Sequence, residues 1–195
     1  MGSVTSTLLG FLWPSPPCAR ISMLGPNNAG KTTMLYRLKD DRLVLTPTTF
    51  YTNTEFVPIN GMTLEIWDIT NFRNVHAMRP HNLWRLYLQH SHGIIYVVDS
   101  TEDEPSRKEE TKQELWAILN NEALVNSSPK MPLLVYANKQ DISYSMIVAE
   151  VRDMLDLESI PSERPWHIQG VSVVTGQGLK EGMDWLTTQL KAEQS

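Results

Sequence analysis

The sequence is poor in cysteine and has no excess of basic charge. Cys18 is the single cysteine, which excludes an internal disulfide framework and a cysteine zinc site and suits a reducing compartment such as the cytosol. Lys and Arg number 17 against 22 Asp and Glu, a formal net charge of -5. Because duplex binding needs a concentrated basic face to neutralise phosphates, nucleic acids are excluded as partners.

Long apolar runs are also missing. The most apolar N-terminal segment is broken by Pro14, Pro16 and Pro17, so no span of about eighteen apolar residues remains to cross a bilayer. The first charged side chain is Arg20, which argues against the positive start of a secretory signal. With 195 residues, of which 41% are hydrophobic, the composition is that of one soluble domain.

Short apolar segments alternate with segments of helical periodicity, as is typical of an α/β domain with a mostly parallel sheet. The predicted strands are residues 20–24, 53–58, 62–69, 93–99, 132–137 and 166–171. The predicted helices are residues 31–39, 82–89, 106–120 and 145–155, followed by an amphipathic helix with Leu179, Met183, Leu186 and Leu190 on its apolar face. Asn60-Gly61 favours a tight turn with positive φ, so the second and third strands should be antiparallel.

A phosphate-binding pattern, Gly25-x-x-x-x-Gly30-Lys31-Thr32, lies between the first predicted strand and helix. Its glycines let backbone N–H groups point at phosphate oxygens, and the following helix presents its positive end. Lys31 adds a full charge, and the Thr32 hydroxyl can ligate Mg²⁺. The predicted phosphate-binding residues are Gly25, Asn28, Ala29, Gly30, Lys31, Thr32 and Thr33. The alternative interpretation is a Gly-rich turn without a ligand.

A second motif, Asn138-Lys139-Gln140-Asp141, follows a predicted buried strand. An ionised Asp141 accepts from two adjacent donors on the edge of guanine, whereas adenine offers no such pair. The stem of Lys139 can cover the base, and Asn138 can tie this loop to the phosphate loop. Alone, this motif is a common surface turn, but downstream of the phosphate loop it indicates guanine binding.

These motifs resemble those of the Arf and Arf-like small GTPases, and the resemblance extends over nearly the whole chain. Its segments are Gly30-Lys31-Thr32-Thr33, Leu35-Tyr36, Pro47-Thr48, Trp67-Asp68, Leu83-Trp84-Arg85, Val97-Val98-Asp99-Ser100, Ala137-Asn138-Lys139-Gln140-Asp141 and Glu181-Gly182-Met183-Asp184-Trp185-Leu186. Residues 38–43 and 61–63 are also similar to the related Sar-type GTPases, the nearer alternative. The resemblance implies a P-loop small GTPase fold, with a mostly parallel six-stranded sheet, helices on both faces and one antiparallel edge hairpin.

The resemblance also assigns roles to residues outside the two motifs. It implies GTP or GDP with Mg²⁺ as cofactors, and Asp68 would hold the metal through water. Thr48 would ligate the metal directly, with Thr49 as the alternative. The backbone at Ser172 and Val173 would read the guanine oxygen. Phe50, Trp67 and Tyr87 would form an aromatic patch for effector proteins, unless they are core aromatics. An exchange factor is a further implied partner, and the protein is expected to be a monomer.

One departure from the family affects catalysis. Where the family has two glycines and a glutamine after the aspartate, this chain reads Asp68-Ile69-Thr70-Asn71-Phe72. The glutamine orients the attacking water, and the phenyl ring of Phe72 has no donor or acceptor for that task. The sequence therefore predicts guanine nucleotide binding with slow hydrolysis. The alternatives are a GTP-locked or nucleotide-insensitive scaffold and, less favoured, a P-loop phosphotransferase acting on a small metabolite.

The N-terminus carries membrane signals. Gly2 and Ser6 satisfy the myristoylation pattern, and Val4, Leu8, Phe11 and Leu12 fall on one face of a predicted helix. We therefore divide the chain into an amphipathic segment, residues 1–18, and one GTP-binding domain, residues 19–195. One acyl chain with an apolar helix implies reversible membrane attachment. We therefore expect a cytoplasmic protein that associates reversibly with a membrane, for which the Golgi or another endomembrane is a candidate. Cys18 is either an inert thiol or a palmitoylation site.

Overall fold

The computed structural model describes residues 18–44, 52–69, 87–121 and 130–193. The elements of this part are β1 (Cys18–Leu24), α2 (Lys31–Asp40), β2 (Asn53–Ile59), β3 (Met62–Asp68), β4 (Gly93–Asp99), α4 (Pro105–Leu119), β5 (Leu133–Asn138), α6 (Val148–Leu155), the 3₁₀ turn η2 (Leu157–Ser159), β6 (Trp166–Gly170) and α7 (Leu179–Glu193). None of the described helices is long and apolar enough to span a bilayer.

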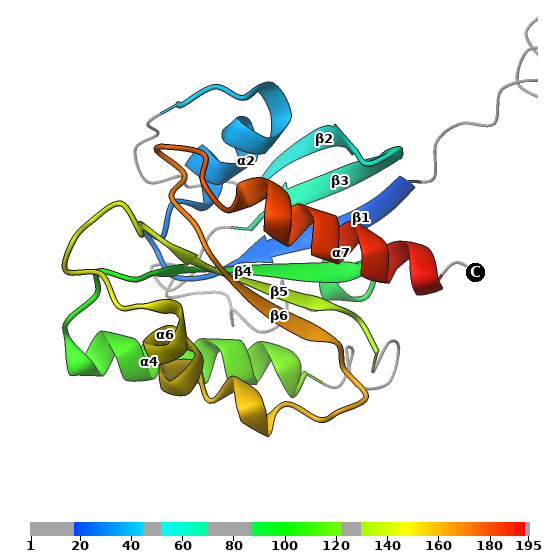
Figure 1. Ribbon diagram of the computed structural model, residues 1–195. Helices are drawn as coiled ribbons and strands as arrows, with labels where there is room; N and C mark the ends of the chain where they lie inside the picture. Colours follow the sequence, from blue (N-terminus) through cyan, green and yellow to red (C-terminus); the bar gives the residue numbers. More distant parts are fainter. Residues whose placement is uncertain (1–17, 45–51, 70–86, 122–129, 194–195) are drawn as a thin grey trace, which may run out of the picture.

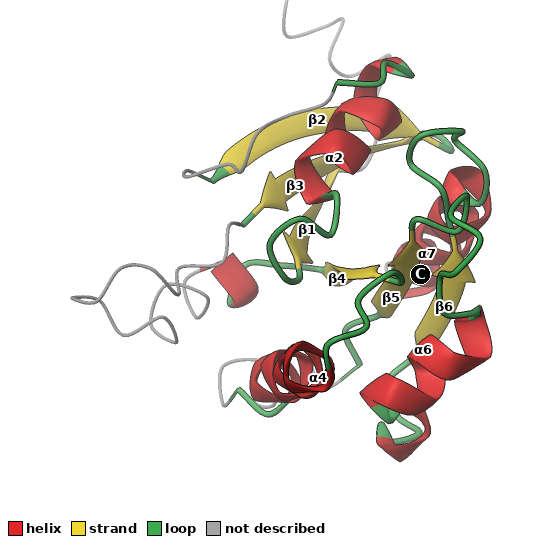
Figure 2. Cartoon of the chain, turned by 90° about the vertical axis from the view of Figure 1, so that its left-hand side faces the viewer, coloured by secondary structure: helices red, strands yellow, loops and turns green. Residues whose placement is uncertain are grey.

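The described strands form one six-stranded sheet in the order β2-β3-β1-β4-β5-β6. Only the edge pair β2–β3 is antiparallel, and all other neighbours are parallel. Helices lie on both faces of this sheet (Figures 1 and 2). The predicted fold is confirmed, including the edge hairpin.

Each face of the sheet has its own apolar core, because successive strand residues point to opposite sides. Ile95 and Val97 of β4 belong to the core under α2 and α7. Their neighbours Ile94 and Tyr96 belong to the core under α4 and α6. Burial on both faces explains why β4 and β5 read as almost continuous apolar runs in the sequence.

The β2–β3 turn is tight and anchored to α7. Asn60 and Gly61 have φ of 50° and 74°, the positive values that the dipeptide favours. The Asn60 amide donates to Asp184 Oδ1 at 2.8 Å and to Thr187 Oγ1 at 2.9 Å. Lys191 Nζ donates to the Asn60 carbonyl oxygen at 2.7 Å. These bonds fix the turn to α7. The turn precedes β3, and Asp68 lies at the other end of that strand.

Two boundaries differ from the prediction by more than one residue. β1 begins at Cys18, which pairs with Thr63, so this cysteine lies in the sheet rather than in the preceding segment. α6 begins at Val148 instead of residue 145, because Met146 N–H donates to the Ser100 carbonyl oxygen at 2.7 Å. Glu150 then caps the helix by accepting from Ile147 N–H at 2.9 Å. Most of the predicted helix 82–89 lies outside the described residues.

Candidate functional site

The phosphate loop joins β1 to α2 at the carboxyl edge of the sheet, where ligands of open α/β folds bind. Its two motif glycines are required by space and conformation. Gly25 has φ of 133°, and a Cβ there would lie 2.2 Å from the Val97 carbonyl oxygen. Gly30 has φ of 96°, and a Cβ there would meet Asn138 Nδ2 at 2.5 Å. Asn28 also has positive φ, at 63°. Turns that contain left-handed residues can direct successive N–H groups to one side, which is how anion-binding concavities form.

Lys31 is held over this loop by the loop's own carbonyl groups. Its ammonium donates to the Gly25 oxygen at 2.7 Å and to the Pro26 oxygen at 2.9 Å, and the residue is 7% exposed. Burial lowers the pKa of Lys31, while the carboxylates of Asp68 and Glu114 oppose that shift. The ammonium is thus a positive charge in a low-dielectric site, where it interacts strongly with an anion.

Thr32 and Asp68 form the predicted metal side of the site. Thr32 Oγ1 donates to Asp68 Oδ2 at 2.5 Å, and Asp68 is fully buried. Within the described part of the chain, Asp68 Oδ1 has no hydrogen-bond partner. Burial raises the pKa of Asp68, although the Thr32 hydrogen bond and Lys31 counteract the shift.

A buried, unpartnered carboxylate oxygen beside a hydroxyl suits Mg²⁺, which prefers oxygen ligands. The residues present therefore fit the metal that the resemblance implies. Thr32 and Asp68 would hold it, and it would neutralise phosphate charge. Thr33 follows in α2 and is half-buried. Thr48 and its alternative Thr49 lie outside the described residues.

Asn138 connects three loops at the other side of the site. This residue ends β5 and is fully buried. Its amide donates to the Ala29 carbonyl oxygen at 2.7 Å, which is the predicted link to the phosphate loop. Its Oδ1 accepts from Val173 N–H at 3.1 Å, so the segment after β6 is held as well. That N–H was predicted to read the guanine oxygen, and a bound base would have to share it with Asn138.

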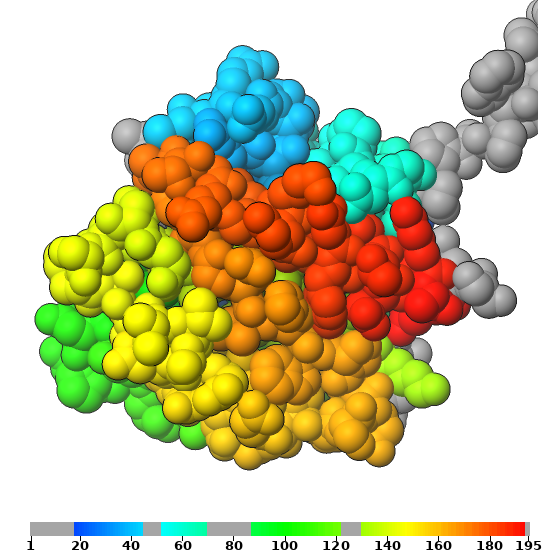
Figure 3. All heavy atoms as spheres, viewed as in Figure 1, coloured from blue at the N-terminus to red at the C-terminus, as the bar shows by residue number. Residues whose placement is uncertain are grey.

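The other residues predicted to bind guanine are Lys139, Asp141 and Ser172, and their surroundings differ. Asp141 is exposed, and its carboxylate has no partner among the described residues, so both oxygens are free to accept. Lys139 donates to Asp99 Oδ2 at 2.5 Å. Ser172 is 2% exposed and stabilises its own turn, because its Oγ accepts from Thr175 N–H at 3.1 Å. This turn lies against α2, as Figure 3 shows for the orange and blue segments.

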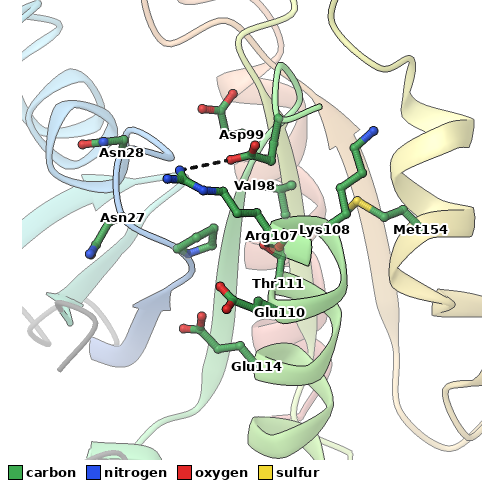
Figure 4. A pocket seen from close by; sticks show the side chains of 12 residues that line it. Asn27, Asn28, Val98, Asp99, Arg107, Lys108, Glu110, Thr111, Glu114 and Met154 are labelled. Atoms are coloured by element: carbon green, nitrogen blue, oxygen red, sulfur yellow. Dashed lines mark hydrogen bonds and ion pairs between the residues drawn. The ribbon is translucent and has the colours of Figure 1, made fainter. Parts of the chain in front are cut away.

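A cavity of about 340 Å³ adjoins the phosphate loop (Figure 4). Asn27 and Asn28 line it from the loop, and Glu110 and Glu114 line it from α4. Within its wall, Arg107 pairs with Glu102 at 3.5 Å. No sequence motif marks this cavity, because its lining comes from elements that meet only in the folded chain.

Trp67 and Tyr87 of the predicted effector patch lie together. Their rings meet edge to face, with centroids 5.3 Å apart and planes at 72°. Both residues are half-buried, and both pack against the core under α4 and α6. Trp67 Nε1 donates to Glu65 Oε1 at 3.0 Å, and Tyr87 Oη donates to Thr52 Oγ1 at 3.3 Å. Phe50 lies outside the described residues.

Known proteins match this chain over nearly its whole length. The model of a family described as "Arf: ADP-ribosylation factor family" matches residues 6–190. Among solved structures, the chain is similar to the Arl6 BBS3 small GTPase from Trypanosoma brucei, determined with the bound nucleotide analogue GppNp. That similarity has a TM-score of 0.77 and 26% sequence identity, and it covers 90% of this chain and 98% of the other.

Proposed function

Because this chain belongs to the ADP-ribosylation factor family, whose members are GTP-binding switches, we propose that it recruits effector proteins to an endomembrane and hydrolyses GTP slowly. Guanine nucleotide is its ligand, and Mg²⁺ is the proposed metal. The proposal has three parts, which are base and metal recognition, slow turnover and reversible membrane binding.

The Asn138 bridge is the observation that carries guanine recognition. One buried side chain joins the phosphate loop at Ala29 to the segment that contains Val173. Asp141 lies three residues further along and has both carboxylate oxygens free to accept. A ligand with phosphates at one end and a purine at the other fits this arrangement. Thr32 and Asp68 add the oxygen ligands for Mg²⁺.

Slow hydrolysis rests on the sequence after Asp68. Phe72 stands where the family has its water-orienting glutamine, and it lies outside the described residues. We expect single-turnover cleavage of γ-labelled GTP to be barely detectable in the natural chain. A triple variant with Thr70→Gly, Asn71→Gly and Phe72→Gln restores the family pattern and should accelerate cleavage. Phe72→Leu is the matched control, because leucine also lacks a donor and should change nothing.

The missing glutamine equally favours the second candidate, a GTP-locked scaffold. Identifying the nucleotide in the purified chain, with and without a magnesium chelator, separates the two. A cycling switch should retain GDP, whereas a locked scaffold should retain GTP. Adenine nucleotide in the extract would contradict both and favour the phosphotransferase.

Membrane binding is proposed from residues 1–18 alone, with Gly2 as the acylation site. Flotation of the acylated, GTP-loaded chain with liposomes should be lost in Gly2→Ala, because one acyl chain supplies much of the affinity. Phe11→Glu keeps the acylation pattern but places a charge on the apolar face, and it should weaken flotation separately. Unchanged flotation of both variants would contradict the membrane role.

A further inference from the structure

The carboxyl end of β4 supports the loop that carries the guanine motif. In the parallel β4–β5 pair, Asp99 is the partner of Asn138. The next backbone contact continues this pairing, since Ser100 N–H donates to the Asn138 carbonyl oxygen at 3.0 Å. Asp99 and Ser100 are therefore placed beside the first residues of the motif.

Asp99 fixes the side chain of Lys139. The Lys139 ammonium donates to Asp99 Oδ2 at 2.5 Å, and the two side chains are 29% and 17% exposed. Lys139 also has φ of 70°, a left-handed conformation that non-glycine residues adopt only where surrounding contacts hold them. The other oxygen, Oδ1, accepts from Thr101 N–H at 2.9 Å and Thr101 Oγ1 at 2.7 Å. The carboxylate is thus immobilised at both oxygens.

Ser100 holds the loop on the other side of the motif. It is 1% exposed, and its Oγ accepts from Gln140 Nε2 at 3.0 Å. The same Gln140 amide donates to the Met146 carbonyl oxygen at 3.0 Å, and Gln140 N–H donates to the Val171 carbonyl oxygen at 3.1 Å. Asp141 follows directly, so its position is set by contacts that do not involve Asp99.

We propose that Asp99 is a positioning residue for the purine: it holds the hydrocarbon stem of Lys139 against the face of the base and thereby raises nucleotide affinity without selecting the base. This inference rests on the proposed binding of guanine nucleotide. Affinity from the ring face and selectivity from the ring edge are then separate, with Asp99 acting on the first and Asp141 on the second.

This separation has a measurable consequence. Guanine and hypoxanthine have the same ring face, but hypoxanthine lacks the 2-amino group that Asp141 accepts from. Loss of Asp99 should therefore lower the affinities for the guanine and the hypoxanthine nucleotide by the same factor. Loss of the edge contact should instead reduce the difference between them.

The test is the release of mant-GDP and mant-IDP from the full chain at one fixed Mg²⁺ concentration, for which the ribose label leaves the base unmodified. Asp99→Asn retains an oxygen for Thr101 but removes the charge that holds Lys139. We expect release of both nucleotides to accelerate about tenfold, with their ratio unchanged. Glu104→Gln is the matched control, because it removes a charge in the same segment but its Oε1 accepts from Ser106 rather than from Lys139. It should leave both rates unchanged.

A second variant, Lys139→Met, keeps an apolar stem and removes the ammonium. It should also accelerate release of both nucleotides, and Asp99→Asn should then add less than about twofold in this background, because the two residues act as one unit. If Asp99→Asn does not fold, Lys139→Met still tests the proposal by its effect on the release of both nucleotides, since it leaves Asp99 and its bonds to Thr101 intact. Unchanged or slower release in the folded variants, or factors that differ between the two nucleotides, would overturn the proposal. If the natural chain binds neither nucleotide, the proposed function itself is wrong.

Discussion

The two sides of the candidate site differ in how their polar groups are satisfied. On the base side, the Asn138 side chain is satisfied within the protein, because its Nδ2 donates to the Ala29 carbonyl oxygen and its Oδ1 accepts from Val173 N–H. On the metal side, Asp68 is as deeply buried, but its Oδ1 has no partner in the described part of the chain. Burying a carboxylate oxygen without a partner is costly. The base side is therefore built by the fold, whereas the metal side keeps a buried carboxylate oxygen that a ligand would satisfy.

The largest expected effect separates recognition from folding on the base side. Asp141→Asn replaces an acceptor by a donor that faces the guanine N–H groups. Affinity for GDP should fall about a thousandfold relative to xanthosine diphosphate, because a hydrogen-bonding site discriminates strongly when its partner is mismatched. The melting temperature should not change, since Asp141 is exposed. Competition binding measures the first effect, and GDP affinity close to that of the natural chain would contradict the assigned role.

The next effect tests whether the base side is part of the fold. Asn138→Ala leaves the Ala29 carbonyl group and Val173 N–H without their partner, so unfolding free energy should fall by about 3 kcal/mol. Nucleotide affinity should fall with it. Asn60→Ala is the control, because it also removes amide hydrogen bonds but far from the site. It should cost about 2 kcal/mol, because these bonds are lost and alanine must adopt a positive φ, and it should leave nucleotide affinity unchanged.

The metal side should respond in the opposite direction. Asp68→Asn removes a buried charge, so the nucleotide-free chain at neutral pH in a chelator should gain about 1 kcal/mol of unfolding free energy. We expect Mg²⁺ to slow GDP release from the natural chain, and the same variant should lose that effect. Denaturant unfolding and GDP release with and without chelator measure the two effects. A variant that is destabilised and still responds to Mg²⁺ would remove the distinction between the two sides.

A smaller effect follows from the pKa of Asp68, which burial raises above its ordinary value of 3.8. The raised pKa means that the folded state favours the protonated carboxyl. Its contribution to the free energy of unfolding is complete below 3.8 and is lost as the pH rises through the pKa of the folded state. Mg²⁺ requires the ionised form, so its slowing of GDP release should weaken as the pH falls toward the raised pKa. Release rates across this range should show the trend in the natural chain and not in Asp68→Asn.

Local signals in the sequence were sufficient for most of the fold. Backbone conformation accounts for the Asn60-Gly61 turn and for the glycine positions of the phosphate loop. Burial accounts for the apolar runs of the central strands. The link from Asn138 to the phosphate loop was also predictable, because two motifs implied one ligand between them.

Contacts between distant elements were not predictable in the same way. The pairing of Lys139 with Asp99 joins residues 40 positions apart, and nothing local to either residue indicates it. The late start of α6 has the same origin, because Ser100 holds Met146 outside the helix. The unpartnered oxygen of Asp68 depends on burial by the whole sheet and could not be inferred from its motif.

The most direct measurement is calorimetric titration of the nucleotide-free full chain with GDP and with ADP in the presence of Mg²⁺. If the phosphate loop and Asp141 bind the two ends of one nucleotide, GDP should bind at least about a hundredfold more tightly than ADP. Equal affinities, or no heat of binding for either nucleotide, would contradict the account.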